Sequence, residues 1–183
     1  MVLLHSEKIP LGSAAVEFNL PSADGKVYSL GDFQSSKLLL VMFICNHCPY
    51  VQAVEDRFIQ LQRDYAAKGL GMAGICSNDP TDYPDDLPKN LLKRWKEKDY
   101  RFPYLIDESQ EVAKSYGAVC TPEFYLFDSD RNLAYHGQLD DNWKDPSKVT
   151  HHTLREVIEK LLAGGKAPES QTPSMGCSIK WKK

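Results

Sequence analysis

The sequence lacks the features that mark nucleic-acid-binding and membrane-spanning proteins. Its formal net charge is −3, and it has no run of lysine and arginine apart from the tail residues Lys180, Lys182 and Lys183. No stretch stays apolar over the roughly 20 residues that a transmembrane helix needs. We therefore expect the protein to bind neither nucleic acid nor a membrane.

The N-terminal residues also lack the basic and apolar segments of a secretory signal peptide, so we expect a cytoplasmic protein. Structural disulfides are rare in that reducing compartment, and the five cysteines are therefore expected to be redox-active or buried thiols. The 183 residues are 42% hydrophobic and 26% charged, which is ordinary for one globular domain. There is no internal repeat.

What the sequence does contain is a Cys-x-x-Cys motif between two strongly apolar segments. Residues 38–44 are seven consecutive apolar residues, a length that favours a strand buried on both faces over a core helix. Cys45 and Cys48 follow directly. After them, apolar residues recur at spacings of three and four from Val51 to Tyr65, the pattern of a helix with one buried face. The segment therefore predicts a strand, a cysteine pair and a helix.

This order has a chemical consequence, because the N-terminus of a helix presents unpaired backbone N–H groups and a partial positive charge. Both favour a thiolate over a thiol, and we expect Cys45 to be the ionised thiol, within reach of solvent. Cys48 would follow closely enough to attack a mixed disulfide at Cys45. His47 would add positive charge whenever it is protonated.

The rest of the chain predicts further strands and helices around this unit. A hairpin is expected at 16–30, where Asp24-Gly25 is a strong turn signal. A polar loop at 78–88 leads into a helix that ends near Lys98, and a short helix ends at Gly117. The other expected strands are 70–76, 102–107, 123–127 and 133–136.

The end of the chain predicts a helix and a tail. Asp145-Pro146 predicts the start of the last helix, with aspartate as its cap and proline at its first position. We assign residues 1–165 to one domain and 166–183 to a C-terminal tail. The tail is too apolar for simple disorder, and we expect it to dock on the domain.

Four features follow one another along the sequence: the unit of strand, cysteine pair and helix, the Thr121-Pro122 before a strand, the closing hairpin and the last helix. In this order they resemble the thioredoxin superfamily. The N-terminal extension at 18–30 is similar to the branch of peroxiredoxins and membrane-anchored thiol reductases, in particular its peroxiredoxin-like group. The likeness covers about residues 10–163. It implies an α/β thioredoxin-like fold, a central mixed sheet flanked by helices, with an N-terminal β-hairpin extension and a C-terminal tail.

The resemblance also implies roles for individual residues. Cys45 matches the exposed attacking thiol, and Cys48 matches the resolving thiol. Pro122 matches the cis-proline that faces the pair and leaves the backbone of Thr121 free to bind an extended substrate, beside Pro49. His47 matches the histidine that precedes the second cysteine in oxidising members.

Two departures from the family patterns bear on the function. A peroxiredoxin would have threonine in place of Cys45 and an arginine near Pro122, and neither is present. A thioredoxin would have tryptophan in place of Ile44 and a buried acid in the preceding strand, which residues 38–44 do not supply. Proton transfer to Cys48 would then need another group or water.

We predict a thiol–disulfide oxidoreductase that acts on a protein or small-molecule disulfide, is recharged by an external dithiol and needs no cofactor. One alternative is a thiol peroxidase in which Cys48 reacts with peroxide. A second is a carrier of copper or another soft metal that uses Cys45, Cys48 and a histidine such as His136.

The other three cysteines are isolated in the sequence. A structural zinc site would need a second closely spaced ligand pair, and Cys76, Cys120 and Cys177 do not provide one. Cys76 ends an apolar run and is expected to be a small buried side chain. Cys177 is a candidate third redox thiol, because a docked apolar tail has no packing need for cysteine in particular. Cys120 is a further candidate because it lies two residues before Pro122.

Overall fold

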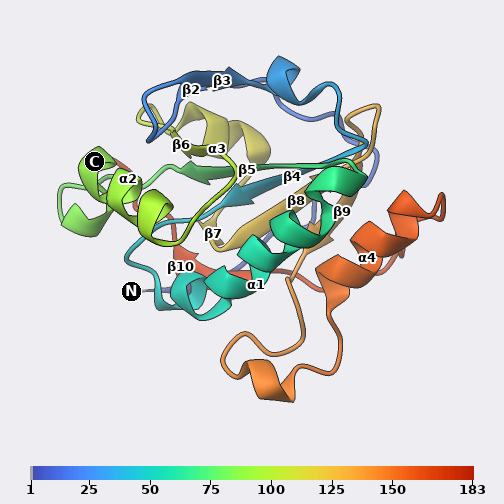
Figure 1. Ribbon diagram of the computed structural model, residues 1–183. Helices are drawn as coiled ribbons and strands as arrows, with labels where there is room; N and C mark the ends of the chain where they lie inside the picture. The colour runs from blue at the N-terminus through green and yellow to red at the C-terminus, as the bar shows by residue number, and fades with distance from the viewer. Residues whose placement is uncertain (1) are drawn as a thin grey trace.

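A five-stranded mixed sheet forms the centre of the protein. Figure 1 shows the computed structural model, which describes residues 2–183. The strand order is β6-β5-β4-β8-β9. Strand β4 is parallel to β5 and antiparallel to β8, so the sheet is mixed. Its strands are β4 (Leu38–Phe43), β5 (Leu70–Cys76), β6 (Tyr104–Ile106), β8 (Glu123–Phe127) and β9 (Leu133–Gly137).

Strand β4 is the middle of this sheet and is buried on both faces. All six of its side chains are at most 4% exposed. Because successive side chains of a strand point to opposite faces, Leu40 and Met42 join one apolar cluster while Leu39 and Val41 join the other. The strand predicted at 38–44 is confirmed, and it ends one residue before Ile44.

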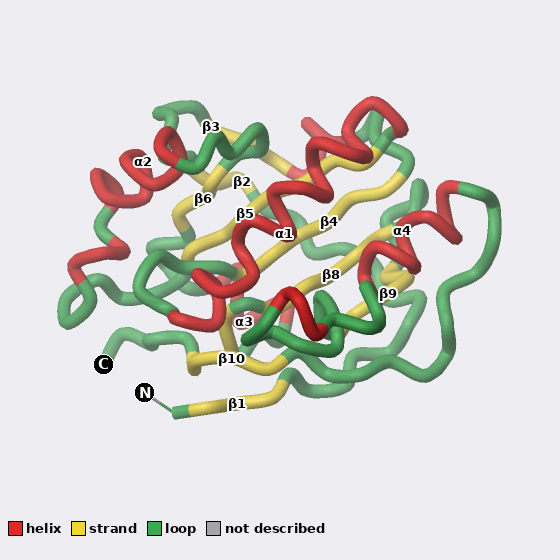
Figure 2. The backbone as a smooth tube through the Cα atoms, turned by 60° about the horizontal axis from the view of Figure 1, so that its bottom comes forward, coloured by secondary structure: helices red, strands yellow, loops and turns green. Residues whose placement is uncertain are grey.

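Helices cover both faces of the sheet. Helices α1 (Pro49–Tyr65), α2 (Pro88–Glu97) and α4 (Thr153–Leu162) contribute to the cluster that contains Leu40. Figure 2 shows α1 and α4 in front of the central strands. Helix α3 (Glu111–Tyr116) packs on the opposite face. This is the thioredoxin-like α/β architecture that the resemblance implied.

The N-terminal hairpin covers the same face as α3. Strands β2 (Asn19–Pro21) and β3 (Val27–Ser29) pair antiparallel. Gly25 in the turn has φ +85°, a conformation that glycine adopts more readily than other residues. The predicted hairpin is confirmed, although its strands are shorter than expected.

The predicted start of the last helix is wrong. Asp145 accepts a hydrogen bond from the backbone N–H of Ser147, as a cap does, but only a single 3-10 turn follows, Pro146–Lys148. The backbone and hydroxyl of Thr150 bind the Asp141 carboxylate, which holds the chain away from a helical path. Helix α4 therefore begins at Thr153. Three further 3-10 turns lie at Leu30–Phe33, Ala66–Lys68 and Pro84–Asp86.

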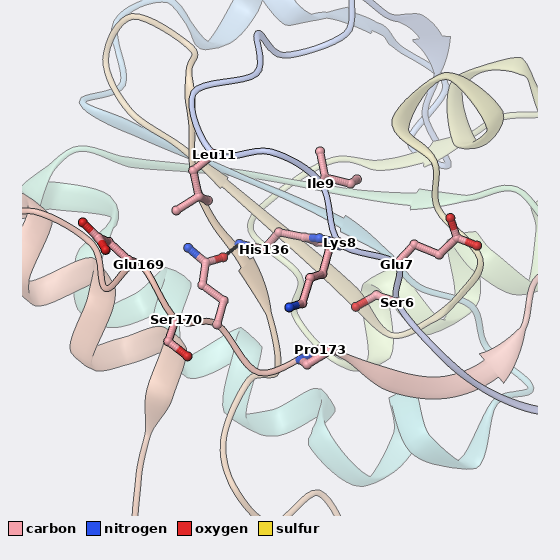
Figure 3. A pocket seen from close by; sticks show the side chains of 10 residues that line it. Ser6, Glu7, Lys8, Ile9, Leu11, His136, Glu169, Ser170 and Pro173 are labelled. Carbon is pink, nitrogen blue, oxygen red and sulfur yellow. Dashed lines mark hydrogen bonds between the residues drawn. The ribbon is translucent and has the colours of Figure 1, made fainter.

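Both ends of the chain meet in a second sheet. Its order is β1-β10-β7, so the C-terminal strand β10 (Met175–Ser178) lies between β1 (Leu3–His5) and the two-residue strand β7 (Cys120–Thr121). A cavity of about 150 Å³ lies between the two ends of the chain, lined by Ser6, Lys8 and Leu11 from one and by Glu169, Ser170 and Pro173 from the other (Figure 3). The tail thus docks through backbone pairing as well as apolar contacts, while the domain boundary at residue 165 stays a prediction.

Paired charges hold α1 in place. Glu55 is 1% exposed and receives two hydrogen bonds from Arg94 of α2, at 2.8 and 2.6 Å. On another side of α1, Arg57 pairs with the buried Asp140. Within residues 2–183, no helix is both long enough and apolar enough to cross a membrane.

Candidate active site

The cysteine pair lies where β4 ends and α1 begins. Cys48 is the residue immediately before α1, and Pro49 is the exposed first residue of the helix. Proline suits that position because its missing N–H removes no helical hydrogen bond. The unpaired N–H groups of the first turn are therefore closest to Cys48.

Three sulfur atoms gather around Thr121. Cys45 Sγ lies 3.3 Å from Thr121 Oγ1, and Cys48 Sγ lies 3.1 Å from the carbonyl oxygen of Thr121. Cys48 Sγ is also 2.9 Å from Cys177 Sγ on β10. The three cysteines are 1%, 0% and 2% exposed, respectively.

The environment favours one thiolate among three sulfurs. Hydrogen bonds from the thiols of Cys45 and Cys177 and from the backbone N–H of Val51 and of Cys177 lower the pKa of Cys48 to about 5. The nearby Thr121 carbonyl oxygen would suit a Cys48 thiol instead. Burial and the carbonyl dipole both oppose ionisation, but the four donors that face the sulfur outweigh them, and we assign Cys48 as the thiolate.

The flanking sulfurs are held as thiols. Burial raises the pKa of Cys45 far above its usual range, and the hydrogen bond to Cys48 and the charge of Asp86 add to the effect. Burial and the hydrogen bond to Cys48 raise the pKa of Cys177 to about 12. Both thiols therefore donate to the Cys48 thiolate.

The prediction of an exposed, ionised Cys45 is wrong for this conformation. Cys45 is sealed inside the protein, and the helix that was expected to stabilise its thiolate begins at Pro49 and acts on Cys48 instead. A carboxylate, Asp86, also lies on the Cys45 side of the site, and its negative charge opposes ionisation of Cys45.

Asp86 is a site residue that the sequence analysis missed. It is 3% exposed and accepts hydrogen bonds from the backbone N–H of Asn46 at 2.8 Å and from the side chain of Asn78 at 2.9 Å. The oxygen that accepts from Asn78 also lies 2.6 Å from Nδ1 of His47, and the backbone N–H of His47 donates to the first oxygen at 3.3 Å. The signal available in the sequence was only its place in an aspartate-rich loop that follows a buried strand.

His47 is packed between this loop and the cysteine pair. Its ring stacks on that of Tyr83, with centroids 4.3 Å apart. The ammonium group of Lys180, from the tail, lies over the Tyr83 ring, 5.2 Å from its centroid. The Nε2 atom of His47 is buried without a hydrogen-bond partner in the described structure. The imidazole of His47 therefore contacts the carboxylate of Asp86 and not open solvent.

One group of side chains in the described residues could hold a metal ion. The ligating atoms of Cys45, His47 and Asp86 lie within 4.8 Å of one another. His136, the histidine suggested for a copper site, does not belong to this group, and that suggestion is wrong. Its Nε2 atom lies 2.8 Å from the Glu123 carboxylate.

The loop before β8 faces the cysteines, as the resemblance implied, but its backbone is occupied. The Thr121–Pro122 peptide bond is cis, and Pro122 is buried. Thr121 pairs with Cys177 of β10, so the prediction that its backbone is free for a substrate is wrong in this conformation. A cavity of about 100 Å³ remains beside Pro122, lined among others by Val54, Trp143 and Met175.

The two remaining cysteines are held as thiols, and the charge of Cys48 contributes to raising the pKa of Cys120. Cys76 and Cys120 are buried, and burial raises the pKa of each thiol far above the usual range. Cys120 Sγ lies 3.6 Å from the carboxylate of Glu123, which opposes ionisation further. Cys76 lines a cavity of about 410 Å³ that also borders Asp86.

Comparison with known proteins identifies relatives. Residues 10–154 match the Redoxin family. The thiol–disulfide oxidoreductase ResA of Bacillus thuringiensis is 28% identical over 161 residues, which cover 85% of this chain and 80% of that protein. A protein of Mycobacterium tuberculosis that is named as a candidate peroxiredoxin is 26% identical over 123 residues, which cover 67% and 73%.

A solved structure extends the likeness to the whole chain. The crystal structure of an uncharacterised conserved protein from Geobacillus kaustophilus has a TM-score of 0.93 and 47% sequence identity to this chain. The match covers 100% of this chain and 97% of that one.

Proposed function

We propose that this chain, which belongs to the Redoxin family and is an oxidoreductase, exchanges thiols and disulfides through the pair Cys45 and Cys48. The observation that carries the proposal is the lowered pKa of Cys48, about 5, beside a Cys45 thiol three residues away. A thiolate is the nucleophile in disulfide exchange, and a neighbouring thiol resolves the product.

The ionisation of the pair favours a definite order of steps. The Cys48 thiolate attacks one sulfur of the substrate disulfide, forms a mixed disulfide and expels the other sulfur as a thiolate. Cys45 then loses its proton, attacks Cys48 Sγ and expels the second substrate thiolate. The substrate gains two electrons and the pair becomes a disulfide. The order predicted from the sequence, with Cys45 attacking, stays a prediction and is the reverse of this one.

Access to the pair requires a movement of the tail. Strand β10 covers Cys48 and pairs with the Thr121 backbone, which is where an extended substrate would bind. We propose that a disulfide substrate displaces β10, and that the cavity beside Pro122 accepts a substrate side chain. An external dithiol would then reduce the Cys45–Cys48 disulfide. A cytoplasmic location stays a prediction.

Trapping tests the proposal and the order of the steps together. The double variants Cys45→Ser/Cys177→Ser and Cys48→Ser/Cys177→Ser and the single variant Cys76→Ser would be mixed with a peptide that contains one disulfide, and covalent adducts counted by mass spectrometry. Cys177 is removed because its sulfur lies 2.9 Å from that of Cys48 and could release an adduct there. We expect a stable adduct on Cys48 in Cys45→Ser/Cys177→Ser and turnover in the control Cys76→Ser. An adduct on Cys45 in Cys48→Ser/Cys177→Ser would restore the order predicted from the sequence. Turnover of the peptide by both double variants would contradict the proposal.

A thiol peroxidase is a second candidate, and the same thiolate supports it. Cys48 lies at the start of a helix and is ionised at neutral pH, as a peroxide-reactive cysteine must be. A peroxiredoxin would have threonine at position 45, where this chain has cysteine, and this difference weakens the candidate. The rate at which hydrogen peroxide oxidises Cys48, measured by stopped flow, tests this candidate. A rate no faster than that of a free thiolate would exclude a peroxidase function.

A further inference from the structure

Strand β10 brings a third thiol to the redox pair. Cys177 Sγ lies 2.9 Å from Cys48 Sγ, which is well inside the contact distance of two sulfur atoms that share no hydrogen bond. The two residues are 129 positions apart in the sequence. Their approach is therefore a product of the fold and not of chain connectivity.

The backbone fixes Cys177 at this place. Cys177 pairs with Leu3 of β1 on one side and with Thr121 of β7 on the other. The preceding Gly176 allows the close approach, because a Cβ atom there would lie 2.0 Å from the Thr121 carbonyl oxygen. The residue after β10, Ile179, donates its backbone N–H to Val119 at 3.0 Å. A series of backbone contacts thus fixes the position of the tail relative to Cys48.

A basic residue favours reaction at Cys177. Lys180 lies two residues beyond β10, and its positive charge lowers the pKa of Cys177, against the larger effect of burial. Once Cys48 is bound in a disulfide, its negative charge is gone, and the strongest charge that opposes ionisation of Cys177 disappears with it. Oxidation of Cys48 therefore prepares Cys177 to act.

We propose that Cys177 is a third redox-active thiol, which takes over the disulfide from the pair by forming a Cys48–Cys177 bond. This inference rests on the proposed function. The Cys177 thiolate attacks Cys48 Sγ in the Cys45–Cys48 disulfide, the Cys45–Cys48 bond breaks, and Cys45 takes up the proton that Cys177 released. No electrons enter or leave the protein in this step. The oxidised sulfur moves from the sealed Cys45 to a strand near the end of the chain.

Disulfide mapping tests this assignment directly. In a tryptic digest Cys48 falls in peptide 38–57 and Cys177 in peptide 167–180, while Cys76 and Cys120 fall in peptides 69–89 and 115–131. Reduced protein would be treated with one equivalent of diamide at pH 7, blocked with an alkylating reagent and digested. We expect the linked pair 38–57 and 167–180 in the wild type, and as the main product in Cys45→Ser.

Two variants complete the test. Cys177→Ser should lose the linked pair and keep the Cys45–Cys48 disulfide, and Cys76→Ser should match the wild type. The inference is overturned if Cys45→Ser forms only intermolecular dimers or oxidised Cys48 without the link. Turnover of a disulfide substrate without the link contradicts this inference alone, whereas the link without turnover contradicts the proposed function alone.

Discussion

Cys48 and its donors explain why one sulfur carries the charge in this site. The thiols of Cys45 and Cys177 and two backbone N–H groups point at it, and such donors favour the charged form of an acid. The sequence predicted the strand, the pair and the helix, because those depend on neighbouring residues. It predicted Cys45 and not Cys48 as the ionised cysteine, which is wrong for this conformation. Which cysteine ionises depends on Asp86 and Cys177, which approach only in the folded chain.

The thiolate is directly visible by absorbance. A thiolate absorbs near 240 nm where a thiol does not, and the pKa of Cys48 is lowered to about 5. Titration of the reduced protein should therefore show one thiolate gained around pH 5. The step should vanish in Cys48→Ser and persist in Cys76→Ser. A first step only near the ordinary thiol pKa of about 8.5 would contradict the assignment.

The same shift makes stability depend on pH in a definite direction. Cys48 has a folded pKa of about 5, and an unfolded cysteine has a pKa of about 8.5. Its contribution to the free energy of unfolding is therefore complete above the unfolded pKa and is lost as the pH falls through the folded pKa. Urea unfolding under reducing conditions should show the stability difference between wild type and Cys48→Ser grow from pH 5 to pH 8.5. A difference that is constant or shrinks would show that Cys48 is a thiol when folded.

Asp86 should tune the redox potential of the pair. Its charge raises the pKa of Cys45, so Asp86→Asn should ease ionisation of the Cys45 thiol. Stabilising the reduced form makes a couple more oxidising, and the potential measured against glutathione should rise. Asp85→Asn, at the exposed neighbouring position, is the matched control and should leave the potential unchanged. An equal shift in both variants would assign the effect to general surface charge.

At the scale of elements, the short strand β10 covers Cys48 and pairs with the Thr121 backbone, so the proposed function requires it to move. Its sequence, Met-Gly-Cys-Ser, has no alternating pattern, and its strand conformation depends on pairing with β1 and β7. The apolar residues of the tail could predict docking, but no local signal predicts the partners. The start of α4 was mispredicted for a related reason, since Asp141 binds Thr150 across nine residues and overrides the local cap signal.

Gly176 offers a way to open the site. An added Cβ would meet the Thr121 carbonyl oxygen at 2.0 Å, so Gly176→Ala should push β10 away from β7. Such overpacking costs about 1–3 kcal/mol of stability, and the alkylation rate of Cys48 by iodoacetamide should rise. Gly31→Ala is the control, because a Cβ there meets nothing closer than 3.4 Å. Unchanged alkylation in a folded Gly176→Ala variant would mean that β10 does not limit access.

At the scale of the whole molecule, both ends of the chain meet beside the candidate active site. Strands β1 and β10 lie side by side below the main sheet (Figure 2). The tail continues across the loop that carries Asp86, where the backbone N–H of Asp79 donates to the carbonyl oxygen of Lys180 at 2.8 Å. The central strands and helices were predictable from apolar patterns, and the thioredoxin-like fold was implied by the family resemblance. The pairing of the two chain ends beside this site was not predictable, because it joins segments that are far apart in the sequence.

A Cys48–Cys177 disulfide should stabilise the whole molecule. It would close a loop of about 130 residues, and the loss of unfolded-state entropy for such a loop amounts to roughly 4–5 kcal/mol. Oxidised Cys45→Ser should therefore unfold at higher urea concentration than the reduced form. A Cys45→Ser, Cys177→Ser double variant should show no dependence on oxidant. Equal midpoints for oxidised and reduced Cys45→Ser would contradict the tail-linked bond.

The central claim is that Cys45 and Cys48 act as one redox couple, and equilibration with glutathione buffers measures it. The Cys177→Ser variant, in which the third thiol cannot take over the disulfide, would be held at a series of ratios of reduced to oxidised glutathione, alkylated and analysed by mass spectrometry of peptide 38–57. The account predicts that both thiols of this peptide disappear together in a single two-electron transition, and that Cys76 stays reduced throughout. If both thiols of peptide 38–57 persist until Cys76 is also oxidised, the account is contradicted.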